Sequence, residues 1–204
     1  MSKVLLINGS PHPFGCTYTA LRETADALEK NGVETEIFHL GTKPIAGCIA
    51  CARCHESGRC VFDDGVNQLL DRLDEFQGIV VGSPVYYAGP AGQLCAFLDR
   101  LFYCSENRMA GKLAAAVVSC RRGGATAAFD RLNKYFTISN MQVVGSQYWN
   151  QIHGRTAEDA KKDLEGLQTM RTLGQNMAWM LKNMENAVPR PEYEKRLRTD
   201  FIQK

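Results

Sequence analysis

Apolar and polar positions along the chain predict strands and helices in alternation. Short continuous apolar runs, typical of strands that are buried on both faces of a sheet, occur at 4–7, 79–81 and 113–118. The segment 33–38 alternates apolar and polar residues instead, which indicates a half-exposed strand at a sheet edge. A last strand is predicted to begin at Val143 and to run to about Trp149.

Apolar residues at helical spacing fill the segments between these strands. The predicted helices begin at Thr17, at Asp63, at Ala91 and near Phe129. A final helix is predicted over about 156–185, where Thr156 and Asp159 resemble a capping box. At about 1.5 Å per residue its length is roughly 43 Å, which suggests a subunit contact beyond the sheet. Pro189 and Pro191 are expected to end it, and the polar tail to lie on the surface.

This order of elements favours one α/β domain over residues 1–204. Five strands with right-handed crossovers give a doubly wound parallel sheet, and an edge-like second strand fits the order 2-1-3-4-5. The loops Ser10–Thr17 and Ser83–Pro90 should then meet at the carboxyl edge of the sheet, where ligands bind in such folds. The segment 40–62 has no clean period and is expected to be a long loop, of a length that is usually functional or disordered.

Composition limits the partners and the compartment. Apolar residues make up 45% of the 204 residues, and the net charge of +2 comes from interspersed charges, so no nucleic acid or membrane partner is indicated. The apolar runs are far shorter than the roughly 20 residues of a spanning helix. The first residues run straight into a strand pattern without a signal sequence, so a cytoplasmic location is expected. Structural disulfides are improbable there, and the eight cysteines need another explanation.

Two loops carry candidate binding chemistry. Ser83–Pro90 places Tyr86 and Tyr87 at the end of a buried strand, where flat apolar side chains and free amides suit a planar ring such as a flavin. Ser10–Thr17 lies between a strand and a helix N-terminus, a position that attracts an anion, and Gly15 allows close approach. It lacks both the Walker lysine and the G-x-G-x-x-G pattern, which fits a permanently bound mononucleotide. The alternative is an ordinary turn capped by hydroxyl side chains.

Through these two loops the chain resembles the NADPH-dependent FMN reductase family of flavodoxin-like proteins, and the resemblance covers nearly the whole chain. The matching motifs are Gly9-Ser10-Pro11…Gly15-Cys16-Thr17 and Ser83-Pro84-Val85-Tyr86…Gly92-Gln93-Leu94…Phe97-Leu98-Asp99-Arg100. The resemblance implies a flavodoxin-like fold and bound FMN. It implies phosphate contacts from Ser10, Gly15, Cys16 and Thr17, with His12 as a further candidate. It implies contacts to the flavin ring from Pro84, Val85, Tyr86, Tyr87 and Gly89. After the fourth strand, Ser119, Arg122 and Gly123 are expected to approach the flavin. Cys16 and Cys95 depart from the family pattern, which often has Asn and Lys there.

Four cysteines lie close together in the 40–62 loop, at Cys48, Cys51, Cys54 and Cys60. This spacing resembles the iron–sulfur flavoproteins, a branch of the same family, and implies that these residues bind a [4Fe–4S] cluster. Zinc modules usually separate two cysteine pairs by a longer spacer, so zinc is the weaker alternative. The loop could also carry cysteines without metal, with Cys48 and Cys51 as small buried apolar residues.

The expected function is an FMN-dependent oxidoreductase that takes electrons from NAD(P)H and passes them to a quinone, an azo or nitro compound, or a free flavin. The flavin carries the redox chemistry, so no catalytic side chain is expected. One alternative is an iron–sulfur electron carrier that exchanges single electrons with ferredoxin; another is a binding module without flavin. The resemblance also implies a homodimer or homotetramer.

Overall fold

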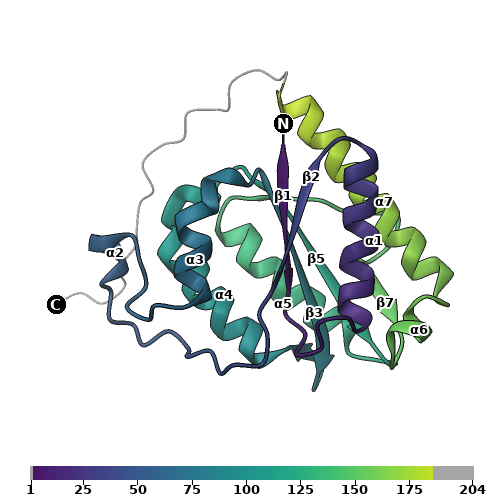
Figure 1. The fold of residues 1–204 in the computed structure, drawn as a ribbon, viewed down its shortest axis with the longest axis horizontal. Coiled ribbons are helices and arrows are strands. Elements are labelled where there is room, and N and C mark those ends of the chain that lie inside the picture. Colours follow the sequence, from purple (N-terminus) through teal and green to yellow (C-terminus); the bar gives the residue numbers. More distant parts are fainter. Residues whose placement is uncertain (1, 186–204) are drawn as a thin grey trace, which may run out of the picture.

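A parallel sheet forms the centre of the molecule in this computed structural model, which describes residues 2–185 (Figure 1). Its long strands are β1 (Lys3–Asn8), β2 (Glu34–His39), β3 (Gly78–Tyr86) and β5 (Leu113–Cys120). The order is β2-β1-β3-β5-β6, and each of these neighbouring pairs is parallel. The predicted flavodoxin-like order, with the half-exposed second strand at the edge, is therefore confirmed.

The fifth position of the sheet differs from the prediction of one strand over 143–149. Two short strands, β6 (Gln142–Val143) and β7 (Gln151–His153), pair in parallel with opposite ends of β5. Between them the buried side chain of Asn150 donates to the carbonyl oxygen of Ala116, 3.1 Å away, and the backbone carbonyl of Asn150 accepts from the N–H of Val118. The chain can therefore leave the sheet over residues 145–149, because the Asn150 side chain supplies the hydrogen bond to β5 that a continuous strand would have made. A further short strand, β4 (Gly89–Pro90), forms a hairpin with β3, which brings the sheet to seven strands within residues 2–185.

Helices cover both faces of the sheet, as predicted (Figure 1). On one face lie α1 (Cys16–Lys30), α6 (Ala157–Ala160) and α7 (Leu164–Glu185); on the other lie α3 (Gly65–Arg72), α4 (Gly92–Ser105) and α5 (Ala125–Ile138). The short helix α2 (Cys54–Ser57) and the 3₁₀ turns Leu73–Glu75 and Glu106–Met109 complete the described elements. The apolar residues of the central strands alternate between two cores, one under each helical layer.

The predicted single helix over 156–185 is two helices. The capping box of Thr156 and Asp159 is present and starts α6. The chain then breaks at Asp163, whose carboxylate accepts from the N–H of Gly166 at the start of α7 and from the N–H of His153. A side chain that caps a new first turn ends the preceding helix, which the apolar spacing alone does not reveal. The expectations for Pro189, Pro191 and the tail lie outside the described residues. Within residues 2–185, no helix is both long and apolar enough to cross a membrane.

Candidate functional site

The carboxyl ends of three neighbouring strands bring the predicted binding loops to one edge. Asn8 at the end of β1 pairs with Gly82 in β3, and the N–H of Gly9 donates to the Gly82 carbonyl at 2.9 Å. Pro84 in β3 pairs with Ser119 near the end of β5. The loops that follow these strands lie at the lower edge of the sheet in Figure 1, so the predicted meeting of residues near 10 with residues near 86 holds.

The loop between β1 and α1 is shaped by its own polar groups. The Asn8 side chain accepts from the N–H of Ser10 at 3.1 Å and donates to the carbonyl of Pro13. The Ser10 hydroxyl accepts from the N–H of His12, whose side chain is exposed. Gly15 is the N-cap of α1, and no side chain within residues 2–185 caps this helix. The first-turn amides and the helix dipole can therefore serve a phosphate.

The beginning of α1 is joined to β5 through a buried pair of hydroxyls. The Thr17 and Ser119 oxygens lie 2.8 Å apart, and both residues are buried. Cys16 is half-buried, and its thiol donates to the carbonyl of Thr156 at 3.1 Å. Burial raises the pKa of the Cys16 thiol, so this side chain is neutral at physiological pH.

The hairpin between β3 and β4 projects from this edge. Its two turn residues, Tyr87 and Ala88, have φ values of 49° and 58°, the left-handed conformation that two-residue hairpins of the I′ type require. Tyr87 is fully exposed and Tyr86 is 45% exposed, while the half-buried Val85 belongs to the core margin. Non-glycine residues held at positive φ are often found at functional sites. Two exposed rings beside a phosphate-compatible loop fit a planar, phosphorylated ligand.

The loop after β5 completes this edge. Arg122 and Gly123 are exposed, and Gly124 has a φ of 84°. A Cβ atom at Gly124 would lie 2.8 Å from the Cα of Ala88, so this loop touches the hairpin directly. The structure thus brings the residues predicted to contact FMN to one edge from the ends of β1, β3 and β5.

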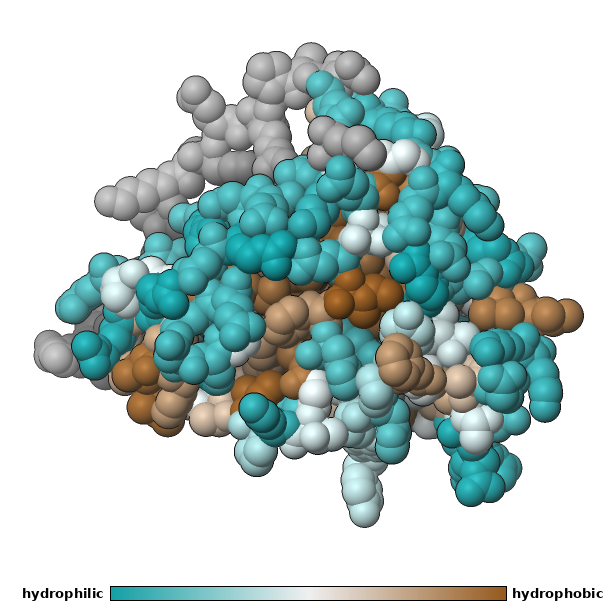
Figure 2. Space-filling view, viewed as in Figure 1, coloured by the Kyte–Doolittle hydropathy of each residue, from teal (hydrophilic) through white to brown (hydrophobic). Residues whose placement is uncertain are grey.

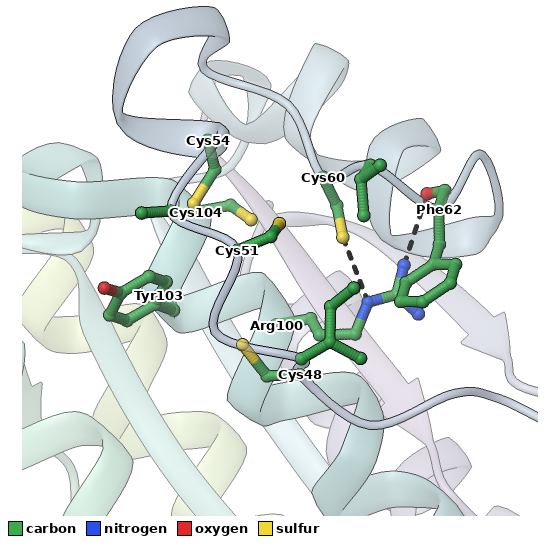
Figure 3. A pocket seen from close by; sticks show the side chains of 11 residues that line it. Cys48, Cys51, Cys54, Cys60, Phe62, Arg100, Tyr103 and Cys104 are labelled. Carbon is green, nitrogen blue, oxygen red and sulfur yellow. Dashed lines mark hydrogen bonds between the residues drawn. The ribbon is translucent and has the colours of Figure 1, made fainter.

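The second candidate site is a pocket between the cysteine-rich segment and α4. Cys48, Cys51, Cys54 and Cys60 all line it. In Figure 3 the sulfur atoms of Cys51, Cys54 and Cys60 gather in the middle of the view and Cys48 lies below them. The eight cysteines of the chain, all within the described part, are free thiols. The sequence motif therefore assembles in space as well as in sequence.

Sequence reasoning missed the contribution of α4 to this pocket. Arg100, Tyr103 and Cys104 line it from the helix side. Their i, i+3, i+4 spacing places them on one face of the helix. This spacing could be read from the sequence, but it did not indicate that the face borders the cysteine-rich segment. Burial, together with the neighbouring Cys54 thiol, raises the pKa of Cys104. The pocket therefore has a fifth thiol that the motif does not include.

The backbone of the cysteine-rich segment is held in an unusual conformation. Ala50 and Ala52, on either side of Cys51, have φ values of 54° and 58°. Left-handed backbone at two alanines is costly and persists where the surroundings impose it. Cys51 and Ala52 both line the pocket, so this left-handed stretch forms part of its wall.

The thiols of the pocket form a candidate donor set for a metal group. Within residues 2–185, no three His, Cys, Asp or Glu side chains converge closely enough to hold a single metal ion. The thiols instead surround a volume, and the Nε of Arg100 donates to the Cys60 sulfur at 3.2 Å. A cluster with one thiolate on each iron needs ligands around a volume, and a cation beside them offsets its negative charge. Four cysteine thiols that line one pocket are a donor set that a [4Fe–4S] cluster takes.

The fold is that of the flavodoxin-like proteins. The solved structure of a flavodoxin from the domain Archaea aligns with a TM-score of 0.58 at 19% identity, covering 89% of this chain and 99% of that one. RosB, solved with an 8-demethyl-8-formylriboflavin-5′-phosphate intermediate, aligns with a TM-score of 0.69 at 16% identity, covering 100% of this chain and 97% of that one.

The sequence comparison identifies the family. Residues 2–155 match the model of the NADPH-dependent FMN reductase family. An iron–sulfur flavoprotein of Methanocaldococcus jannaschii is 36% identical over 190 residues, which cover 88% of this chain and 97% of that protein. The chain belongs to the NADPH-dependent FMN reductase family, which supports activity as a flavin oxidoreductase.

Proposed function

We propose that the protein is an FMN flavoprotein that also holds a [4Fe–4S] cluster and passes single electrons between the flavin and a protein partner such as ferredoxin. The observation that carries this proposal is the pocket lined by Cys48, Cys51, Cys54 and Cys60. The similarity to iron–sulfur flavoproteins supports it.

In this proposal the loops at the carboxyl edge of the sheet hold FMN. Its phosphate is bound at the start of α1 by Ser10, His12, Gly15, Cys16 and Thr17. Its ring lies against the hairpin and the loop after β5, with contacts from Pro84, Val85, Tyr86, Tyr87, Gly89, Ser119, Arg122 and Gly123. When bound, FMN supplies one- and two-electron redox chemistry. The protein binds and orients it, and the exposed tyrosine rings shield it from water.

The thiol pocket would hold the cluster through thiolates of the four motif cysteines. A bound cluster supplies one-electron transfer. Cys48 and Cys51 are exposed, so the site lies near the surface. Ile49 is 61% exposed and Val61 is 42% exposed at its rim, and Figure 2 shows apolar residues gathered along the lower left of this face. An apolar rim beside a redox centre favours docking of a partner protein.

This function is tested by purifying the protein without oxygen, reconstituting it with iron and sulfide, and measuring its FMN content, iron content and absorbance spectrum. The native protein should contain FMN and about four irons per chain, with broad absorbance near 400 nm beyond the flavin bands. Cys51→Ala should lose the iron and keep FMN. Cys95→Ala is the matched control, because Cys95 is a half-buried thiol of α4 outside the pocket, and it should keep both. Iron-free native protein would refute the cluster.

A second candidate is direct oxidation of NAD(P)H with transfer to a quinone, an azo or nitro compound, or a free flavin. The match to the NADPH-dependent FMN reductase family favours it. Steady-state NADH and NADPH consumption with each acceptor separates the two functions, because a carrier gives negligible turnover without its protein partner. We further propose a cytoplasmic homodimer or homotetramer; the exposed Tyr148, Trp149 and Trp179 support a subunit contact, and sedimentation of the FMN-loaded protein tests it.

A further inference from the structure

Arg100 is a buried cation at the thiol pocket. Its side chain is 1% exposed, and its guanidinium forms a two-pronged pair with the Asp64 carboxylate at 2.7 and 2.9 Å. Its Nε donates to the Cys60 sulfur at 3.2 Å (Figure 3). One charged group therefore connects a carboxylate to a motif cysteine.

The same guanidinium fastens both ends of the cysteine-rich segment. It donates to the carbonyl of Ala46 before the motif and to that of Phe62 after it, each at 3.2 Å. It also lies over the Phe62 ring, 4.9 Å from its centre. Cys60 is held independently, since the Asn67 side chain accepts from its N–H and donates to its carbonyl. The geometry at the Cys60 sulfur is thus fixed by the protein.

Charge and hydrogen bonds at the sulfur atoms set the reduction potential of an iron–sulfur cluster. A cation favours the reduced state, which carries one more negative charge, and a carboxylate opposes it. Arg100 touches Cys60 directly, whereas Asp64 is 34% exposed and acts from behind the guanidinium. The two members of the pair should therefore shift the potential in opposite directions.

We propose that the Arg100–Asp64 pair sets the reduction potential at the thiol pocket, with Arg100 acting through Cys60 as a positioning residue. This inference rests on the proposed cluster. The electron that defines the potential enters from a chemical reductant, dithionite, and no bond forms or breaks at Arg100. A purely structural clasp would instead lose the cluster whichever partner is removed.

The test is an anaerobic potentiometric titration of the reconstituted, FMN-containing protein, followed by electron paramagnetic resonance of the reduced cluster. Arg100→Gln should make the midpoint potential more negative by at least 59 mV, a tenfold change in the one-electron equilibrium. Asp64→Asn should make it more positive. Asparagine is also a good N-cap, so this variant preserves the bond that Asp64 accepts from the N–H of Val66 at the start of α3. Arg100→Lys keeps the charge and should shift the potential less than Arg100→Gln.

The matched control is Arg72→Gln, which removes a two-pronged arginine–carboxylate pair with Glu36, outside the thiol pocket; the potential should not move. If Arg100→Gln does not fold, the Asp64→Asn protein tests the inference on its own: a more positive potential supports it, and an unchanged or more negative potential overturns it. The double variant, which removes both charges, should lie closer to the native potential than Arg100→Gln does. If the Arg100→Gln and Asp64→Asn proteins kept the native potential, or if their potentials shifted in the same direction, this inference would be overturned. The proposed cluster would still stand. Absence of iron in the native protein would overturn the proposed function as well.

Discussion

Gly124 couples the loop after β5 to the hairpin that we propose to contact the flavin, and its replacement by alanine tests that coupling. A Cβ atom there would lie 2.8 Å from the Cα of Ala88, 3.1 Å from its Cβ, and 3.1 Å from a methyl carbon of Val85. Ala88 is itself held at a φ of 58°, and Gly124 at 84°. Neither backbone can turn freely, so the hairpin must move away from the new methyl group.

The magnitude has two parts. Left-handed backbone at a non-glycine residue costs about 1–2 kcal/mol, and this lowers the free energy of unfolding whether or not FMN is bound. Overpacking costs about 1–3 kcal/mol if the hairpin is forced back to its native position. The ligand-free protein can relieve the second part by moving the hairpin, but FMN binding reverses that movement. The dissociation constant for FMN should therefore rise about 5- to 150-fold.

Fluorescence titration of the ligand-free protein with FMN measures this constant, and urea unfolding of the same samples measures stability. Gly32→Ala is the matched control, because Gly32 has a φ of 78° and, apart from its own atoms and its two chain neighbours, no atom of residues 2–185 lies within 4 Å of a Cβ placed there. This control should lose similar stability and keep the native FMN affinity. An unchanged dissociation constant for Gly124→Ala would refute the placement of the ring against this hairpin.

Three further outcomes follow from other contacts. Asn150→Ala should lower the free energy of unfolding in urea by about 1–3 kcal/mol, because the buried Ala116 carbonyl loses its donor. Arg72 hydrogen-bonds Glu36 and holds the pKa of that carboxyl below the ordinary value of about 4.3, so the pair stabilises the fold above that pH and loses its effect as pH falls through the lowered pKa. Arg72→Gln should therefore be less stable than the native protein at pH 7, with a difference that shrinks in unfolding experiments below about pH 4. Cys104→Ala should keep its iron on analysis, because the motif cysteines provide four thiolates without it.

The central strands were predictable because burial on both faces leaves a continuous apolar run, which needs no knowledge of distant residues. The strand order then followed from the edge character of β2, and it placed the two binding loops at one edge. The split fifth strand was not predictable in this way. It depends on Asn150, whose side chain takes the place of a strand neighbour of β5. The side chain donates to the carbonyl of Ala116, which lies 34 positions away in the sequence. The break between α6 and α7 likewise depends on what Asp163 binds.

The same division holds for the candidate sites. The motif cysteines are local in sequence, so their spacing alone indicated one site. Arg100 lies 40 positions from Cys60, and only the fold shows that it reaches the sulfur. A lone arginine in a helical pattern is normally a solvated residue. Its burial against a carboxylate and a thiol is a tertiary property that no local pattern encodes.

The helix α4 links the two candidate sites and fixes their relative position. It begins at Gly92, directly after the hairpin strand β4, and the N–H of its N-cap residue Ala91 donates to the Ser83 hydroxyl at 2.9 Å. Arg100, eight residues further along, faces the thiol pocket, which corresponds to about 12 Å of helix. Gln93 in the first turn also donates to the carbonyl of Gly41, where the cysteine-rich segment leaves β2. Sites built on one rigid helix keep their separation more precisely than sites on two independent loops. The electron exchange that we propose between a flavin at the sheet edge and a cluster in the pocket depends on their separation, and α4 connects the two sites through one continuous helix.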